Sequence, residues 1–201
     1  EVGSFVSPRA VPAMAGAADV VAGLPSGKAT YSALIPNRRG YDLATAAGVT
    51  TVEIVVAATQ TMNEKNINSS TEAAMAGCED IVAAAKQDGV KTLSCIATAW
   101  ECPFEGLVEE DVVLGLARDM FAHGADEVVL ADTIGAANPA SVRRLTQRAA
   151  DEFGAQRIHC HFHDTRGMGV ANVAAAIESG IRRFDASIGG LGGCPFAPGA
   201  T

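Results

Sequence analysis

Short apolar runs alternate with longer alanine-rich stretches along the whole chain. The apolar runs have the length and the β-branched content of strands, and they lie at 1–5, 31–36, 51–58, 91–100, 126–133, 157–164 and 182–190. The stretches with helical spacing lie at about 69–89, 109–123, 139–153 and 168–180. Strand and helix alternate at roughly 25 to 35 residues per unit, which predicts repeated βαβ units and a parallel sheet.

The ends of two predicted helices carry recognisable signals. The helix over 69–89 opens with Ser69 or Ser70 as an N-cap and closes at Gly89. The helix over 139–153 begins at Pro139, a residue that suits the first helical position because its missing N–H is not needed there.

Two parallel architectures compete, an open doubly wound sheet and a (β/α)8 TIM barrel. No GxGxxG motif follows the first strand, which weakens the dinucleotide-binding form of the open sheet. Polar residues gather where the predicted strands end, and in a barrel those ends converge on one mouth. We therefore expect an α/β fold of the (β/α)8 type with seven of the eight strands, as one partial domain over 1–201.

Composition excludes several classes of protein. The 201 residues suffice for one domain with its own core, and 48% hydrophobic with 19% charged residues is typical of a soluble globular chain. A net charge of −8 makes nucleic acid a poor partner. No apolar run reaches the ~20 residues of a membrane span.

The N-terminal residues resemble neither a signal nor a transit peptide. The five scattered cysteines form no CxxC pair, which indicates reduced thiols.

The stretch HCHFHDTRG at 159–167 is the first candidate for chemistry. Residues two apart in a strand point to the same side, so His161 and His163 face one way and His159 continues the stripe. Two such imidazoles can chelate one cation. The same pair could equally be hydrogen-bonded core histidines, and the spacing alone leaves both interpretations open.

A second candidate is the loop GGLGGCPFAPG at 189–199. Four glycines before Cys194 allow the backbone to approach a ligand closely or to adopt positive φ. A thiol on such a loop is a candidate proton donor or nucleophile, although its reactivity depends on its pKa. The alternative is a surface loop that happens to contain a cysteine.

Three further polar positions fall on the same predicted rim. Asp132 and Thr133 stand at a strand end, where an aspartate indicates a role at the rim because strands disfavour it. We expect NEKNINSS at 63–70 and CPFEG at 102–106 to be polar loops that either contact substrate or cap helices.

Taken in order, these motifs resemble the 3-hydroxy-3-methylglutaryl-CoA lyase family of TIM-barrel metallolyases. The resemblance rests on EVGSFVSPRAVPAM, NEKNINSS, CPFEG, ADTIG, HFHDTRGMGVAN and GGLGGCPFAPGA, which together span the chain. The cysteine loop is the most specific of them. The resemblance implies a metal-dependent cleavage of the acyl-CoA into acetyl-CoA and acetoacetate.

The resemblance implies roles for individual residues at the matching positions of this sequence. His161 and His163 match the family's two imidazole ligands of Mg2+ or Mn2+, and Cys194 matches its active-site cysteine. Glu1 matches an acidic residue on the second strand that the family needs for activity, and Asp132 matches an important aspartate of the sixth strand.

Two elements of the family pattern have no match in these 201 residues. They are an Arg-Asp pair on the first strand and a Gly-Asn pair after the cysteine loop. We therefore expect strands two to eight of the barrel, without the first strand and the last helix, with weak Mg2+ binding and low turnover. His159 has no counterpart in the family, and we expect it to be structural.

Other functions remain open at this stage. A related Claisen-type synthase or 4-hydroxy-2-oxoacid aldolase shares the histidine pair, although the cysteine loop argues against both. A non-catalytic barrel remnant or binding module is the alternative from a different class. The expected partner is a small acyl-CoA, with no nucleic acid and no membrane; a homodimer is undecided. The expected compartment is the cytoplasm, or the mitochondrial matrix in a eukaryote.

Overall fold

A parallel five-stranded sheet organises the chain. The computed structural model describes residues 1–9, 11–190 and 192–193. The strands run in the order β1, β2, β3, β6 and β7, and their bounds are Ser32–Ile35, Thr51–Ala57, Lys91–Ala97, Glu127–Asp132 and Ile158–Phe162. All four pairings between them are parallel. The short strands β4 (Glu101–Cys102) and β5 (Gly106–Leu107) form a separate antiparallel hairpin.

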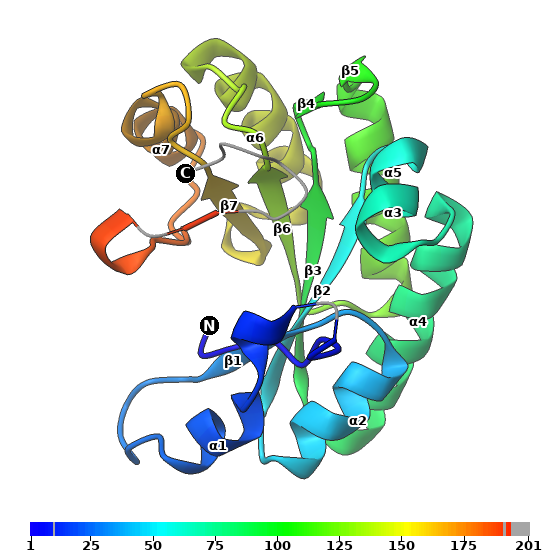
Figure 1. Ribbon diagram of the computed structural model, residues 1–201. Coiled ribbons are helices and arrows are strands. Elements are labelled where there is room, and N and C mark those ends of the chain that lie inside the picture. The colour runs from blue at the N-terminus through cyan, green and yellow to red at the C-terminus, as the bar shows by residue number, and fades with distance from the viewer. Residues whose placement is uncertain (10, 191, 194–201) are drawn as a thin grey trace.

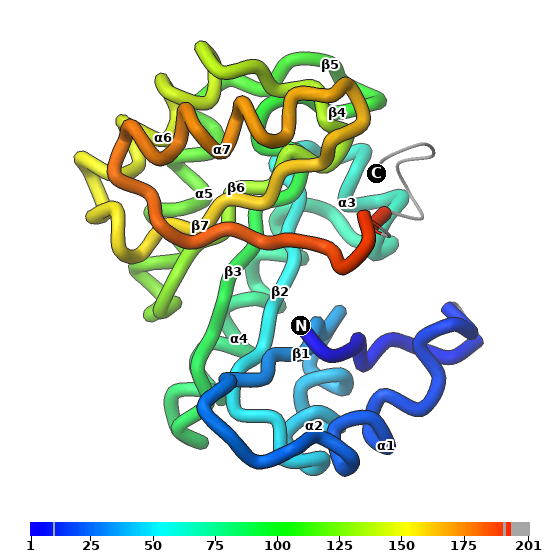
Figure 2. Tube along the Cα trace, turned by 90° about the vertical axis from the view of Figure 1, so that its left-hand side faces the viewer, coloured from blue at the N-terminus to red at the C-terminus, as the bar shows by residue number. Residues whose placement is uncertain are grey.

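Two extended segments continue the sheet at its edges. Ser4 bridges to Leu34 of β1, and Phe184 bridges to Cys160 of β7, each in parallel orientation. Figure 2 shows the segment after the last helix running beside β7. The seven expected strand positions are therefore confirmed, but the first and last are single bridges. The run at 182–190 is not a full strand, because residues 188–190 turn into a 3-10 helix.

Helices cover one face of this sheet (Figure 1). The larger ones are α2 (Arg38–Ala46), α4 (Thr71–Asp88), α5 (Glu110–His123), α6 (Pro139–Phe153) and α7 (Gly169–Glu178). Two shorter helices are α1 (Ala17–Ala22) and α3 (Gln60–Ile67), and 3-10 turns lie at Pro12–Met14 and Ala155–Arg157. The arc of parallel strands with helices outside is the arrangement of an incomplete (β/α)8 barrel, as the sequence predicts.

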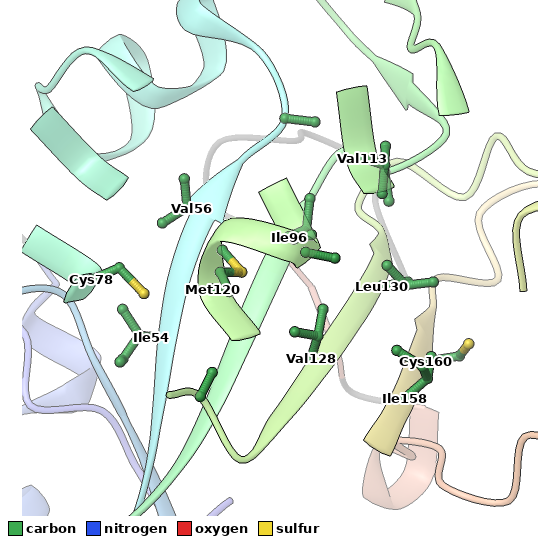
Figure 3. Close-up of a cluster of buried hydrophobic side chains, with 14 of the residues drawn as sticks. Ile54, Val56, Cys78, Ile96, Val113, Met120, Val128, Leu130, Ile158 and Cys160 are labelled. Atoms are coloured by element: carbon green, nitrogen blue, oxygen red, sulfur yellow. The ribbon is translucent and has the colours of Figure 1, made fainter. Parts of the chain in front are cut away.

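The main hydrophobic core lies between the sheet and the helices. Figure 3 shows how strand side chains, among them Ile54, Ile96 and Leu130, meet Cys78 of α4 and Met120 of α5. Because neighbours along a strand point to opposite faces, the alternate residues of each strand face the inside of the arc. Because the strand residues that face the helices are buried in this core, the residues between them must line the inside of the arc.

The predicted helix ends are confirmed. The Ser70 hydroxyl accepts a hydrogen bond from the Ala73 N–H at 3.1 Å, so Ser70 rather than Ser69 is the N-cap of α4. Gly89 ends the helix at φ 70°, a conformation that glycine adopts without steric cost. Asn138 forms a capping box ahead of Pro139 in α6.

The expectation of a loop over 63–70 is wrong for most of its length. Helix α3 extends to Ile67, and only the residues after it are non-helical. Asn63 is buried, and its amide exchanges hydrogen bonds with the backbone N–H and C=O of Ala57 and also donates to the Thr71 hydroxyl. A polar residue that makes these bonds inside the fold is compatible with a helix, although its polarity suggests a surface loop.

No helix in the described part of the chain is long and apolar enough to cross a membrane.

Candidate functional site

The histidine stripe lies on the inner face of β7. Ile158 and Cys160 point outward into the main core, so His159 and His161 between and after them point into the arc. The alternation that the sequence predicts for this strand is therefore present. His163 follows two residues beyond His161, just past the carboxyl end of the strand, and is buried.

The two expected metal-binding imidazoles face one another. Nε2 of His161 lies 3.2 Å from Nε2 of His163, and the ring centroids are 5.0 Å apart with the planes at 50°. At this distance one Nε2 donates a hydrogen bond to the other, and the tautomers decide which of the two is the donor. This arrangement agrees with a pair of metal ligands and also with a pair of hydrogen-bonded histidines, so the metal-binding role stays a prediction.

Asp185 lies on the opposite side of the His161 ring. Its Oδ2 is 2.7 Å from Nδ1 of His161, and both side chains are about two-fifths exposed, at 40% and 38%. Burial opposes protonation of His161, but the hydrogen bond and the charge of Asp185 raise the pKa of this imidazole overall. Burial also disfavours the Asp185 anion, yet its hydrogen bond with His161 lowers the pKa of the carboxyl. The sequence pattern did not single out Asp185, although an aspartate in a strand-like run was a signal.

Glu1 reaches the same neighbourhood. Burial raises the pKa of its side chain, and the negative charge of Asp185 adds to the rise. The charge of His161 acts on Glu1 in the opposite direction. The structure thus brings Glu1 into electrostatic contact with His161.

A further carboxyl group lies inside the arc on β2. Burial, followed by the negative charges of Glu1 and Asp185, raises the pKa of Glu53 to about 7. The buried Cys95 thiol on the adjacent strand hydrogen-bonds this carboxyl. The sequence analysis missed Glu53; a single acidic residue in the apolar run TVEIVVAA was the available signal.

The hydrogen bonds of Asp132 go to the turn after β6 and not to the imidazoles. Its carboxylate accepts the backbone N–H groups of Ala136 at 2.8 Å and Ala137 at 3.1 Å, which folds the turn after β6. Burial raises the pKa of Asp132, while those two hydrogen bonds and the charge of Arg166 lower it. The predicted catalytic role of Asp132 stays a prediction, and its visible role is to shape this turn.

That turn is packed against the histidine strand. Gly135 has φ 62°, and a Cβ at this position would lie 2.9 Å from the carbonyl oxygen of His163. Thr133 accepts the backbone N–H of Thr98 at 2.8 Å and so joins the ends of β6 and β3. Only glycine lets the turn approach the backbone of His163 so closely.

The CPFEG hairpin contributes a helix cap. Glu105 accepts the backbone N–H of Thr61 at 2.7 Å, in the first turn of α3. Cys102 receives a hydrogen bond from Thr59 at 3.1 Å. The Glu105 contact shows that the hairpin caps a helix, while a role of these loops in substrate contact stays a prediction.

Two remaining expectations concern His159 and the cysteines. The pKa of His159 is lowered by burial, and its Nδ1 is a buried atom without a hydrogen-bond partner in the described part of the chain. The four described cysteines (Cys78, Cys95, Cys102 and Cys160) are free thiols, as expected. Cys194 lies outside the described residues.

The histidine pair fits a divalent cation in part. Two converging imidazole nitrogens are suitable ligands for a divalent metal ion, whereas Mg2+ and Mn2+ also take oxygen ligands. No cluster of three or more His, Cys, Asp or Glu side chains within the described ranges has the arrangement of a metal site. The described residues thus supply two of the ligands that such an ion needs.

The fold and this site together define a class: a parallel α/β barrel whose strand ends carry a paired-histidine centre. The particular family follows from comparison with known proteins. The family described as HMGL-like matches residues 8–195, and the chain belongs to it.

Similar proteins agree with this assignment. The chain is 41% identical to hydroxymethylglutaryl-CoA lyase of Bacillus subtilis over all of its residues and 68% of that protein. The crystal structure of hydroxymethylglutaryl-CoA lyase from Pseudomonas aeruginosa superimposes with a TM-score of 0.94 at 42% identity, over 100% of this chain and 67% of that one. An HMG-CoA lyase of Acinetobacter baumannii in complex with coenzyme A and 3-methylmalate gives 0.95 at 40% identity, over 99% of this chain and 65% of that one. The chain thus spans about two thirds of the length of these relatives.

Proposed function

We propose that this protein is a metal-dependent carbon–carbon lyase that cleaves 3-hydroxy-3-methylglutaryl-CoA into acetyl-CoA and acetoacetate. The observation that carries the proposal is the convergence of His161 and His163 at the carboxyl end of β7. It occurs in a chain about 40% identical to lyases named for this substrate, and a barrel mouth is where such enzymes place their chemistry.

His161 and His163 would hold the divalent ion, Mg2+ or Mn2+, with oxygen ligands in the remaining positions. When bound, such an ion supplies Lewis acidity that lowers the pKa of the substrate hydroxyl and fixes its orientation. The protein would contribute the Nε2 lone pairs of His161 and His163, which point toward the same position. The turn around Gly135 supports the backbone of His163 there.

The chemistry needs one base and one acid. A base takes the proton of the tertiary hydroxyl, the C–C bond breaks, and its electron pair remains on the thioester fragment as an enolate. The Cys194 thiol then gives its proton to the enolate carbon, which yields acetyl-CoA. Glu1 interacts electrostatically with His161, and burial raises its pKa, so we assign it as a candidate base. Asp132 is the alternative base, acting through a water molecule.

The direct test is a product assay on the protein expressed from its complete reading frame. With 3-hydroxy-3-methylglutaryl-CoA and Mg2+ or Mn2+, we expect acetoacetate and acetyl-CoA in equal amounts. Cys194→Ala is expected to lower kcat by about 10²–10⁴-fold. Cys78→Ala, in α4 and remote from the histidines, is the matched control and should leave kcat nearly unchanged.

The same assay separates the neighbouring functions. Condensation of acetyl-CoA with a 2-oxoacid, with no cleavage of 3-hydroxy-3-methylglutaryl-CoA, would assign the protein to the Claisen-type synthases and overturn the proposal. Cleavage of citramalyl-CoA in preference would keep the lyase chemistry and change the substrate, since a citramalyl-CoA lyase is 38% identical to this chain. A cytoplasmic or matrix location and a homodimeric state accompany the proposal as expectations.

A further inference from the structure

We infer that Asp185 is a positioning residue that fixes the orientation and tautomer of His161, so that Nε2 of this imidazole is free to bind the metal ion. The inference rests on the proposed function, because that function identifies the ligand of His161 as a divalent metal ion. Its structural basis is the hydrogen bond of 2.7 Å between Asp185 Oδ2 and His161 Nδ1.

The backbone places Asp185 behind the ring. The segment 183–185 pairs with β7 through two hydrogen bonds, from the Cys160 N–H to the Arg183 carbonyl and from the Asp185 N–H to the Cys160 carbonyl. Phe184 packs outward against the main core, so its neighbour Asp185 faces the inside of the arc beside His161. The parallel bridge between the two segments thus determines which imidazole the carboxylate meets.

The chemistry of the contact determines the tautomer. A carboxylate only accepts hydrogen bonds, so the proton of the short contact belongs to Nδ1 of His161. In the neutral ring, Nε2 then carries a lone pair, and this is the atom that faces Nε2 of His163 at 3.2 Å. A carboxylate that holds the far nitrogen of a metal-binding histidine sets its orientation and raises its basicity.

Asp185 is distinct from the other carboxylates nearby. Glu1 and Glu53 influence His161 through their charges, whereas Asp185 both carries a charge and makes a directed hydrogen bond. Removal of the Glu53 charge should therefore leave the tautomer intact, and removal of Asp185 should not. This difference supplies a matched control.

The test reads the tautomer in the metal-free chain. With 15N-histidine labelling of the protein expressed from its complete reading frame, the imidazole signals of the four histidines in this sequence can be assigned by substitution. At pH 8.5, His161 is expected in the Nδ1–H form in the unsubstituted chain and in Glu53→Gln, and to lose this form in Asp185→Ala. An Nε2–H form in the unsubstituted chain would overturn the inference without the need for any variant.

A second readout is the midpoint of line broadening of the His161 and His163 signals on titration with Co2+. Asp185→Asn, which keeps the side-chain volume, should raise the midpoint concentration about tenfold or more, the usual effect of losing such a partner. Glu53→Gln should shift it by less than about threefold, because it removes a charge but no hydrogen bond. Equal midpoints for Asp185→Asn and the unsubstituted chain would contradict the positioning role. Both readouts need no substrate. A protein that fails to cleave the C–C bond of 3-hydroxy-3-methylglutaryl-CoA yet shows the Nδ1–H form would reject the proposed function and keep this inference.

Discussion

The inside of the strand arc gathers ionisable side chains that influence one another. Glu53 is coupled to Glu1, Asp185 and His161, and the raised pKa of about 7 follows first from burial and then from the two neighbouring negative charges. The hydrogen bond with Cys95 acts in the opposite direction and lowers the pKa of Glu53. The carboxyl of Glu53 therefore exchanges its proton close to neutral pH, inside the fold.

This coupling predicts a pH-dependent stability that Glu53→Gln removes. The folded chain holds the Glu53 proton more tightly than the unfolded chain, whose carboxyl has the ordinary pKa of 4.5. The contribution of Glu53 is thus full below about pH 4.5 and is lost as the pH rises to about 7. Above pH 7, Glu53→Gln should be the more stable protein, by at most about 3 kcal/mol. Urea unfolding from pH 4.5 to 8 measures this, and a difference between the two proteins that does not change with pH would contradict it.

At the scale of elements, the turn after β6 supports the site. Asp132 folds the turn through two backbone N–H groups, and Gly135 then lies against the carbonyl of His163. The position of one metal-binding imidazole therefore depends on a neighbouring loop whose shape comes from a carboxylate and a glycine.

Gly135→Ala should both destabilise the fold and weaken the site. An alanine there has an unfavourable left-handed conformation, which costs about 1–2 kcal/mol, and its Cβ would displace the backbone at His163. The control is Gly115→Ala in α5, where the added Cβ meets open space. The control should stabilise the helix by about 0.5–1 kcal/mol. Thermal unfolding together with Co2+ titration checks both variants, and an unaltered Co2+ midpoint in Gly135→Ala would separate the turn from the site.

The elements differ in how far sequence could predict them. Helices α4 to α7 were predictable because each combines an apolar period with a cap signal or a closing glycine, as Ser70 and Gly89 do for α4. Helix α3 was missed because its buried residue Asn63 is polar and obtains its hydrogen bonds from the backbone at the end of β2, outside the helix. The periodicity of a short helix cannot reveal such bonds, which arise only from the tertiary fold.

The candidate site was likewise predictable in part. The spacing of His161 and His163 places them on one face of a strand, and the structure confirms this. Their partner Asp185 lies 24 residues from His161, and its contact depends on which segment pairs with β7. Pairing between distant segments is set by the whole fold, so a local pattern does not contain it.

At the scale of the whole molecule, an ion cluster joins three segments of the arc near its amino-terminal end. Glu127 of β6 is 5% exposed and contacts both Lys91 of β3, at 2.6 Å, and Arg183 of the last segment. Its second oxygen, Oε2, is a buried atom without a partner in the described part of the chain. The cluster links β6 with the segment that carries Asp185.

Glu127→Gln should therefore destabilise the fold. Loss of the charge weakens two charge-assisted contacts of a buried group, and we expect a loss of about 1–3 kcal/mol in the free energy of unfolding. Arg148→Ala removes a pair of exposed ionic contacts with Glu110 and Asp111 and serves as the control, with little expected change. Chemical denaturation compares them; an equal effect of the two substitutions would show that the cluster contributes no more than a surface ion pair.

The measurement that bears most directly on the central claim is anomalous diffraction from crystals of the protein, expressed from its complete reading frame and grown with Mn2+. The account predicts one Mn2+ peak within bonding distance, roughly 2.0–2.3 Å, of Nε2 of both His161 and His163. Manganese bound elsewhere, with both imidazoles turned away from it, would contradict the claim that these two residues form a metal centre at the barrel mouth.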